Sequence, residues 1–313
     1  MWAYIIRRLL ATIPVAAVVA VFVFMLLHLA PGDPAAVIAG SYAMPKDIER
    51  IREKLGLNEP IYIQFGKWIS HVARGDLGDS IFSEMPVTKL IGQRLEPTIS
   101  LAIASIVVAI LFAVPIGILA AWKAGTWIDH VVMIFAVLGF SVPVFVIGYI
   151  LMYVFSIQTH IFPVQGFVSI REGFLPFLRT ITLPSIALGL IYAALIARIT
   201  RASLLDVLAQ DYVRTAHAKG LSSWVVLFRH ALKNASVPIV TIIGVGIALL
   251  IGGVVVTESV FNIPGLGRLV VDSVLARDYP VIQGIILMFS GVYLLINLII
   301  DISYSFLDPR INY

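Results

Sequence analysis

The chain has 313 residues, of which 60% are hydrophobic and 13% are charged, and its mean hydropathy is +0.99. Ordinary soluble domains are only about 45 to 50% apolar, so this composition excludes a soluble globular protein and predicts a membrane protein. The net charge of +4 is too small to indicate a nucleic-acid surface, and the lack of cysteine excludes disulfides, thiolate metal sites and cysteine nucleophiles.

The first apolar run covers residues 9–29 and follows a short basic start. It is about as long as a bilayer requires. Its length exceeds that of a signal-peptide core and no small-residue cleavage site follows, so we expect a retained span within an N-terminal segment of residues 1–29. The turn residues Pro31-Gly32-Asp33-Pro34 end this span.

The longest polar stretch, residues 30–97, is predicted to form an extramembrane lobe. Pro45 can start a helix that Gly56 closes, and Pro60 can start a second amphipathic helix. The lobe carries balanced numbers of acidic and basic residues, which argues against a nucleic-acid surface. Near its end, Gly75-Asp76-Leu77-Gly78-Asp79-Ser80 is typical of a turn.

Five further apolar runs are each long enough to cross a bilayer. They cover about residues 98–122, 131–156, 181–199, 237–257 and 280–300. With the first run this makes six spans, so both termini lie on the same side of the membrane.

The distribution of lysine and arginine indicates which side that is. If the N-terminus is cytosolic, ten of these residues face the cytosol: Arg7, Arg8, Lys123, Arg198, Arg201, Arg214, Lys219, Arg229, Lys233 and Arg310. The short outer loops hold four: Arg171, Arg179, Arg268 and Arg277. Cytosolic loops of membrane proteins carry an excess of lysine and arginine, so both termini are predicted to be cytosolic.

Two other classes of function are weakly supported. No acidic or basic residue lies near the middle of any span, whereas proton-coupled transporters usually need an intramembrane acid or histidine relay. An ion-coupled secondary transporter is therefore the alternative rather than the first hypothesis. The sequence contains no G-x-x-x-x-G-K-[ST] phosphate loop and no pair of histidines at helical metal-binding spacing, so neither autonomous ATP hydrolysis nor a metal site is expected.

Residues 211–238 form a polar island between two apolar runs. Apolar residues at helical spacing predict one helix through residues 205–219, and Gly220 follows it where a left-handed residue is favoured. A second helix can begin at Ser222 or Ser223 and end near Asn234 and Pro238.

Two interpretations of this island remain open. It is either a basic loop kept in the cytosol by insertion rules alone, or a rigid docking element that transmits a partner's motion to the attached spans. Attachment to spans at both ends argues against a helix-turn-helix that inserts into a DNA groove.

The residues here also carry a family resemblance. Tyr212 to Ser222, YVRTAHAKGLS, followed by His230-Ala231-Leu232-Lys233-Asn234 and Pro238, resembles the cytoplasmic loop of ABC importer permeases. More narrowly, it is similar to the dipeptide, oligopeptide, glutathione and nickel group. The usual form there is TARAKG, so His217 stands where that group has an arginine, and no charge contact is carried over to this position.

Three further segments support the same resemblance. Residues 75–80 match a GDLGxS signature, and residues 261–269 resemble the FxxPGLGRL element of these permeases. Leu307-Asp308-Pro309-Arg310 resembles their DPR ending. The matches are spread along almost the whole chain, and their order and spacing together are specific.

The resemblance implies an all-α type I ABC importer permease fold with six transmembrane helices in the bacterial inner membrane. Residues 1–29 would hold the first span, residues 30–97 an extracytoplasmic helical lobe, and residues 98–313 a five-helix core with an ATPase-docking loop at 201–236. The chain would form half of a translocation pathway for a dipeptide, an oligopeptide, glutathione or a nickel chelate.

The resemblance also implies partners. They are a homologous second permease, two cytosolic ATPase subunits and an extracytoplasmic substrate-binding protein, in addition to membrane lipid and without nucleic acid. This chain would bind no cofactor itself, because ATP and Mg²⁺ are used by the ATPase subunits.

The residues that match the family's motifs fall in two groups, and none is expected to be catalytic or to bind metal. The docking-loop residues are Asp211, Tyr212, Arg214, Ala216, His217, Lys219, Gly220, Leu221, His230, Asn234 and Pro238. The outer-loop residues are Gly75, Asp76, Gly78, Ser80, Glu258, Pro264, Gly265, Gly267 and Arg268.

Overall fold

The computed structural model describes residues 2–29, 33–40, 44–54 and 56–307. Pro31, Gly32 and the Asp308-Pro309-Arg310 ending, which the sequence singled out, lie outside the described residues. The part of the chain that is described folds into helices, and its only strand-like feature is an isolated bridge between Asp79 and Pro86. The expected all-α class is confirmed.

The chain divides into two compact units, and the first comprises Met1–Glu96 and Gly265–Leu295. Its elements are α1 (Trp2–Leu29), α2 (Pro34–Ala39), α3 (Pro45–Lys54), α4 (Ile61–Ala73), the start of α5 (Val87–Trp122), α12 (Leu266–Ala276) and most of α13 (Tyr279–Leu307). The two lobe helices that the prolines predicted are α3 and α4, whereas α2 and α12 were not expected.

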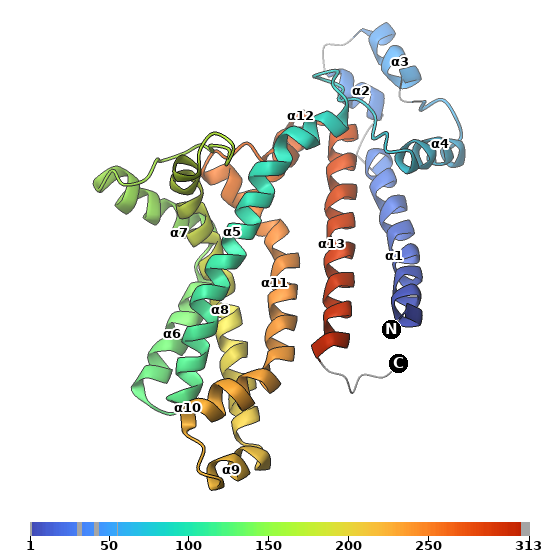
Figure 1. Ribbon diagram of the computed structural model, residues 1–313. Helices are drawn as coiled ribbons and strands as arrows, with labels where there is room; N and C mark the ends of the chain where they lie inside the picture. The colour runs from blue at the N-terminus through green and yellow to red at the C-terminus, as the bar shows by residue number, and fades with distance from the viewer. Residues whose placement is uncertain (1, 30–32, 41–43, 55, 308–313) are drawn as a thin grey trace. The chain divides into compact units, whose positions relative to one another are not determined.

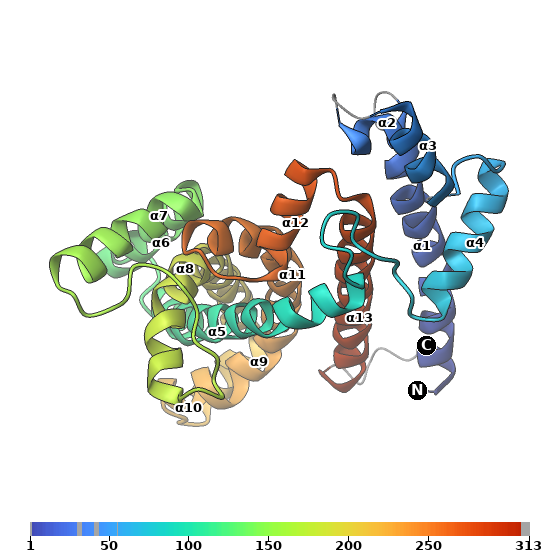
Figure 2. The same ribbon diagram turned by 90° about the horizontal axis from the view of Figure 1, so that it is seen from above.

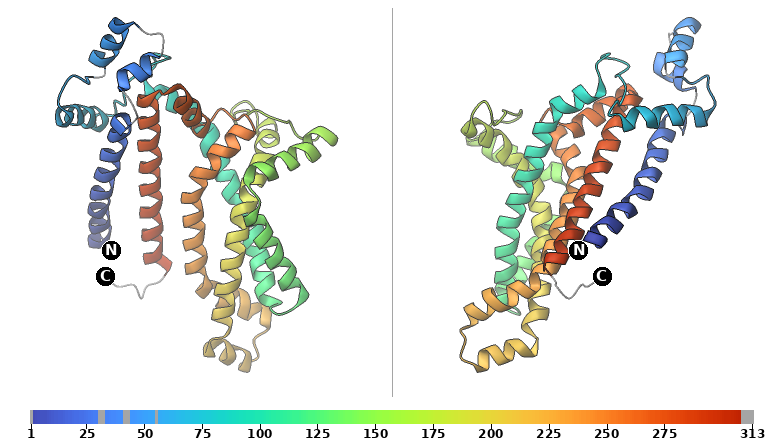
Figure 3. Two further views of the ribbon diagram at one scale, coloured as in Figure 1. Left: turned by 180° about the vertical axis from the view of Figure 1, so that it is seen from behind. Right: turned by 45° about the vertical axis from the view of Figure 1, so that its right-hand side comes forward.

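Within this unit α1 and α13 run side by side in opposite directions (Figures 1 and 3). The Gln283 amide on α13 donates a hydrogen bond to the Val23 carbonyl of α1 at 3.1 Å. Helix α4 packs on α1 through aromatic rings, with Phe65 and Trp68 at 5.3 and 5.6 Å from Phe24 between centroids. These contacts join the first span to the lobe.

The second unit comprises Pro97–Pro264 and Ile296–Tyr313. It holds the rest of α5, followed by α6 (Trp127–Ser141), α7 (Val144–Leu151), the π-helical η1 (Met152–Gln158), α8 (Phe174–Leu208), α9 (Asp211–Ala218), α10 (Ser223–Val225), the π-helical η2 (Val226–Ala231) and α11 (Leu232–Val260). Helix α8 lies at its centre, in contact with α6, α7 and α11 (Figure 2). Its apolar core includes Leu101 of α5, Leu188 and Ile196 of α8, and Leu250 of α11.

Five stretches of helix are long and apolar enough to cross a membrane: Arg7–Leu29, Val87–Trp122, Phe174–Leu208, Ser223–Ile247 and Tyr279–Ile302. Each of these helices overlaps one of the six predicted spans. Several are longer than expected. The second begins at Val87, ahead of Pro97, so the predicted lobe boundary at residue 97 falls inside a helix.

The sixth candidate corrects the prediction of one unbroken span over residues 131–156. Helices α6 and α7–η1 together meet the same criteria but are bent by 103°. The residue before a proline is disfavoured in the helical region, and Val142, which precedes Pro143, is extended at φ −88° and ψ 125°. This span is therefore a broken pair of helices.

Candidate functional site

The predicted docking segment, residues 201–236, lies in the second unit, where α8 leaves the core and α11 re-enters it. The expected single helix over residues 205–219 is wrong, because α8 ends at Leu208 and α9 begins at Asp211. Gln210 between them is extended, at ψ 149°. The polar Gln210-Asp211 pair interrupts an apolar spacing that by itself favoured continuity. The segment from Asp211 to Ala218 is thus a separate short helix.

The end of α9 follows the prediction for Gly220. This residue has a left-handed φ of 80°. The Gly220 N–H donates to the His217 carbonyl at 2.9 Å, and the Leu221 N–H donates to the Ala216 carbonyl at 3.3 Å. This pair of bonds is a Schellman motif, which satisfies the last carbonyls of a helix and turns the chain sharply.

The second helix of the segment starts after Ser222 but continues further than predicted. Helices α10, η2 and α11 follow one another without a gap from Ser223 to Val260. Asn234 and Pro238 therefore lie inside a continuous helical run and do not mark an exit. A proline within a membrane helix is tolerated because neighbouring groups satisfy the freed carbonyl.

Apolar contacts hold α9 against this second helix. Val213 and Ala216 of α9 are buried together with Val226 of η2, and Leu208 packs beside them. Ala216, an expected docking residue, is therefore part of the support. The Asn234 side-chain amide donates to the Tyr212 hydroxyl at 2.7 Å and links α9 to the start of α11.

The charged docking residues point outward. Asp211 and Arg214 form only a long ion pair of 3.6 Å, with side chains 97% and 79% exposed. Such surface pairs contribute little to stability. His217, Lys219 and Leu221 are also exposed. Of the remaining predicted residues, His230 is half-buried, and Asn234 and Pro238 are exposed.

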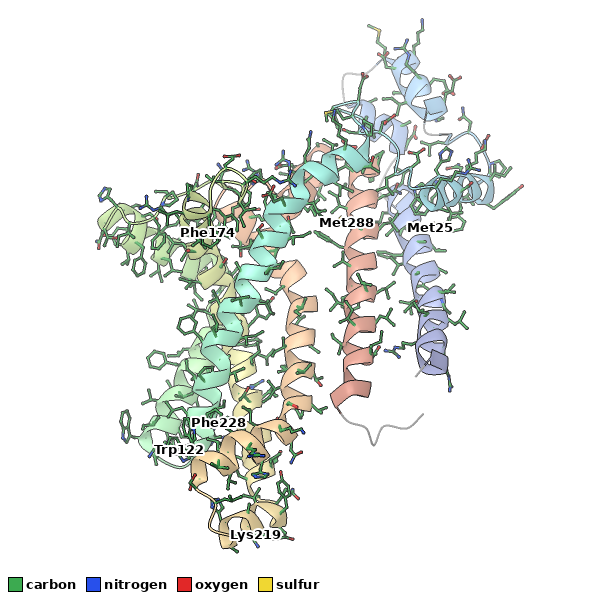
Figure 4. All side chains as sticks on the ribbon, in the orientation of Figure 1. Met25, Trp122, Phe174, Lys219, Phe228 and Met288 are labelled. Carbon is green, nitrogen blue, oxygen red and sulfur yellow. The ribbon has the colours of Figure 1, made fainter. Side chains whose placement is uncertain are left out.

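An exposed aromatic cluster joins the second helix of the segment to the end of α5. The Trp224 ring is 4.3 Å from Phe228 and 5.8 Å from Trp122, between centroids. The Lys123 ammonium lies over the Trp122 ring at 5.2 Å. Figure 4 shows Trp122, Phe228 and Lys219 toward one end of the second unit, away from Phe174.

An ion pair between the buried Asp129 and the half-buried Arg201 supports the docking segment, and sequence reasoning missed it. The Arg201 guanidinium on α8 donates to both carboxylate oxygens of Asp129 on α6, at 2.5 and 2.6 Å. The Gly125 N–H donates to the same carboxylate at 3.0 Å, and Asp129 is 3% exposed. Bidentate pairs of this kind fix geometry as well as adding energy. The end of α8 that leads to α9 is thereby bound to α6.

The predicted outer-loop residues are divided between the two units. In the first unit, Gly75 and Gly78 both have φ 80°, and the Asp76 carboxylate accepts from the Gly78 N–H at 2.9 Å. The Ser80 hydroxyl donates to Asp278 Oδ2 at 2.5 Å, and the Ile81 N–H donates to Asp278 Oδ1 at 3.2 Å. Both Ser80 and Asp278 are buried. The turn is thus anchored on a buried carboxylate.

Asp76 is also bonded to the His71 ring at 2.9 Å. The Gly78 N–H, followed by the His71 ring, lowers the pKa of the Asp76 carboxyl below its ordinary value. The side chain therefore stays ionised through the neutral and mildly acidic range.

The remaining predicted outer-loop residues of the first unit lie at the start of α12. Gly265 precedes this helix and Gly267 is buried within it. Arg268 contacts Asp272 one turn later, at 3.8 Å.

Glu258 and Pro264 belong to the second unit, where Glu258 is fully buried. Its side chain is 0% exposed, and its Oε1 accepts from the Thr98 hydroxyl at 2.5 Å. The Ile263 N–H donates to the Glu258 carbonyl at 2.9 Å, which closes the loop around it, and Pro264 is half-buried. An acid at the end of an apolar run gave no signal of this burial.

Comparison with known proteins identifies the family of this chain. Residues 113–313 match the family described as "Binding-protein-dependent transport system inner membrane component", and residues 1–102 match the corresponding N-terminal family. The chain belongs to this family. It is an inner-membrane permease of the binding-protein-dependent ABC importers.

Individual relatives agree over the whole length of the permease. It is 54% identical over 313 residues to a probable peptide ABC transporter permease protein, y4tP, of Sinorhizobium fredii, and covers 100% of both chains. It is 47% identical to the glutathione transport system permease protein GsiC of Escherichia coli K12, over 99% of each chain. These relatives do not support the alternative of an ion-coupled carrier.

A solved structure supports the fold. The inward-facing MetNI methionine ABC transporter aligns with a TM-score of 0.59 at 15% identity, covering 71% of the permease and 97% of that chain. The predicted type I importer permease fold is confirmed, and the apolar helices together with the family make this a multi-pass inner-membrane protein. Permease subunits of this family have no ATPase site.

Proposed function

We propose that the permease forms half of the translocation pathway of an importer for short peptides. The relatives named for peptide and for glutathione, itself a small peptide, support this substrate class. A nickel chelate, the other substrate considered from sequence, has no counterpart among these relatives. A homologous second permease would complete the pathway, and an extracytoplasmic binding protein would deliver the substrate.

The docking role of α9 rests on one observation above the others. The short helix is closed by a Schellman motif and buried on one side by Val213, Ala216 and Val226, while its charged side chains face outward. Both of its ends lead into helices of membrane-spanning length. A basic tether needs neither a fixed end nor a buried face. This geometry suits a rigid element that a cytosolic ATPase subunit grips.

The proposed mechanism uses this rigidity. ATP and Mg²⁺ bound by two partner ATPase subunits bring those subunits together, and α9 moves with them. The Asp129–Arg201 pair makes α6 follow the cytosolic end of α8. ATP drives the switch only because the assembled subunits contact one conformation of the permease differently from the other. Hydrolysis then resets the pathway.

The outer-loop residues are proposed to serve the binding protein. The turn from Gly75 to Ser80 is exposed except at the half-buried Leu77 and the buried Ser80, and it is held in one conformation by Asp278. A preformed turn binds a partner without an ordering cost. The lysine and arginine bias further supports cytosolic termini, and in that orientation the turn would lie on the extracytoplasmic side.

Uptake measurements test the transport proposal. The permease, its second permease and the ATPase subunits are expected to co-purify, and peptide uptake should persist when the proton gradient is collapsed while ATP is maintained. Uptake by this chain alone in proteoliposomes, driven by an ion gradient, would overturn the proposal.

Cysteine labelling tests the orientation separately, since the chain has no cysteine of its own. An impermeant thiol reagent should label Ser70→Cys in intact cells and label Ser222→Cys only after permeabilisation. The reverse pattern would contradict cytosolic termini.

A further inference from the structure

A cavity of about 450 Å³ lies within the first unit. It is lined by α1, the last turn of α3 and the segment after it, α4, the turn near Gly78 and the start of α13. Ligand pockets commonly span roughly 300–1,000 Å³, so this one has room for a dipeptide-sized molecule. Of the predicted outer-loop residues, only Asp76 and Gly78 line the cavity. The role proposed for those residues therefore does not account for it.

Its walls are held by specific contacts, so the cavity is preformed. Phe24 and Trp68 form an aromatic wall with ring centroids 5.6 Å apart. The Gln283 amide ties α13 to α1, and the Asp278 carboxylate holds the turn through Ser80. A rigid pocket loses little conformational entropy when a ligand enters it.

The charges around the cavity are unbalanced. Four carboxylates line it, from Glu53, Glu59, Asp76 and Asp79, against the single ammonium of Lys67 and the ring of His71. Asp76 stays ionised, because its bonds to Gly78 and His71 lower its pKa. The net field therefore favours a cation and disfavours a free anion.

Glu59 has unused hydrogen-bonding capacity. Its Oε1 accepts from the Lys67 ammonium at 2.6 Å. Its Oε2 is buried and has no hydrogen-bond partner among the described residues. Buried polar atoms are seldom left in this state without a reason. The terminal torsion of a glutamate is broad, so a turn of the carboxylate presents Oε2 to the cavity that Glu59 lines.

The chemistry of these groups narrows the ligand. Across the described residues, no group of three or more histidine, aspartate or glutamate side chains has the geometry to hold a metal ion. An organic ammonium instead offers three donors to a carboxylate and is attracted to the face of an aromatic ring such as that of Trp68. The apolar lining from Phe24 and Leu27 suits a hydrocarbon side chain beside that ammonium.

We propose that this cavity binds the N-terminal ammonium and first side chain of a short peptide whose first residue is apolar. Glu59 accepts the ammonium, Trp68 and Phe24 cover the side chain, and Asp79 contributes negative charge at the edge. The identification of the ligand as a peptide rests on the proposed transport function, whereas the ammonium site rests on the cavity itself.

Equilibrium binding to the full-length permease in lipid nanodiscs, without any binding protein, tests the proposal. The probe is tritiated leucyl-leucine, compared with N-acetyl-leucyl-leucine and with leucyl-leucine amide. Acetylation removes the positive charge and should weaken binding by about tenfold or more, as expected for a lost charged hydrogen bond. Amidation removes only the carboxylate and should preserve binding. Equal binding of the free and acetylated probes would overturn the site.

Three variants test whether Glu59 accepts the ammonium. Glu59→Gln keeps the shape of the side chain and should weaken leucyl-leucine binding by about tenfold. Glu84→Gln, which changes an exposed acid of the same unit outside the cavity, should leave binding unchanged. Lys67→Met should tighten binding several-fold, because it removes the cation that competes for Glu59. A structural role for Lys67 predicts no tightening, so unchanged or weaker binding in Lys67→Met would contradict the proposal.

The cavity site and the proposed transport function can be disproved independently of each other. Intact peptide uptake with no probe binding would overturn the cavity site alone. Retained, ammonium-dependent probe binding in a complex that imports no peptide would support the site and overturn the transport proposal.

Discussion

The docking segment and the outer turn are both short polar loops that the sequence singled out, yet they are held in different ways. The docking segment keeps its shape through the backbone conformation of Gly220 and apolar contacts of Val213 and Ala216. The outer turn is anchored through Ser80 and Ile81 on the buried carboxylate of Asp278. A loop of the first kind can be re-aimed with little loss of stability. A loop of the second kind loses its anchor when one carboxylate is removed.

The largest effect is expected from removal of the buried Asp129 carboxylate, which binds Arg201 in the part of α8 that leads to α9. Asp129→Ala leaves the half-buried Arg201 guanidinium without its partner. Breaking a fully buried pair typically costs about 3–5 kcal/mol, and the partial exposure of Arg201 lowers that cost. We expect much lower abundance in the membrane and a lower melting temperature. Immunoblotting and thermal unfolding in detergent measure both.

Two further variants identify the cause. Asp206→Ala removes an exposed acid from α8, the helix that carries Arg201, and should leave abundance unchanged. The double variant Asp129→Leu/Arg201→Met replaces both charges by apolar side chains and should recover much of the stability. If the double variant is less stable than Asp129→Ala, the loss does not come from an unpaired charge.

Removal of Asp278 should have the next largest effect, confined to the first unit. Asp278→Ala leaves the Ser80 hydroxyl and the Ile81 N–H without their acceptor, and each unsatisfied buried donor costs about 1–3 kcal/mol. Limited proteolysis should then cut the outer turn much faster than in the parent protein. Asp272→Ala changes an exposed acid of α12 and serves as the control. Equal cutting rates in the Asp278 and Asp272 variants would show that the turn has another anchor.

Much of the helical fold could be predicted from sequence, and the tripeptide Ser-Val-Pro shows where prediction stopped. It occurs at residues 141–143, where the helix breaks, and again at 236–238, where the helix continues. The local chemistry is identical, so the outcome is decided by packing. Ala235 and Ile239, which flank the second copy, are both buried, whereas Phe140 and Val144, which flank the first, are exposed and half-buried.

The candidate site divides in the same way. Gly220 was predictable because a left-handed helix end is a local property of three or four neighbouring residues. The Arg201–Asp129 pair joins residues 72 positions apart, and the Ser80–Asp278 bond joins residues 198 positions apart. Nothing in the periodicity or composition of either segment identifies its partner. Long-range polar contacts therefore required the structure.

Substitution of Gly220 should separate stability from function. A Cβ at this position would meet nothing within 4 Å, so the only cost is the left-handed conformation, about 1–2 kcal/mol. Gly220→Val should therefore keep near-normal abundance. Relief of that strain re-aims α10 relative to α9, and peptide uptake should fall sharply, either because the ATPase subunits no longer bind or because they hydrolyse ATP without transport.

Gly166→Val is the matched control for this substitution. Gly166 also has a positive φ and an open site for a Cβ, but it lies in a loop outside the docking segment. Its uptake should stay near that of the parent protein. If Gly220→Val transports as well as the parent, the segment is a basic tether, and its defined shape has no part in coupling.

The smallest expected effect is the pH dependence of the outer turn. The Gly78 N–H and the His71 ring lower the pKa of Asp76, so its contribution to stability is present above the unfolded-state value, roughly 3.9, and is lost as the pH falls through the lower folded-state value. Asp76 is 56% exposed, which keeps the contribution small. Hydrogen exchange of the Gly78 amide, corrected for its intrinsic rate, should show protection that decreases on acidification in the parent protein. In Asp76→Asn, whose amide oxygen still accepts from Gly78 but does not titrate, protection should be independent of pH. If the parent shows the same constancy, the positive φ of Gly75 and Gly78 holds the turn without the carboxylate, and the outer turn resembles the docking turn more closely than its buried anchor suggests.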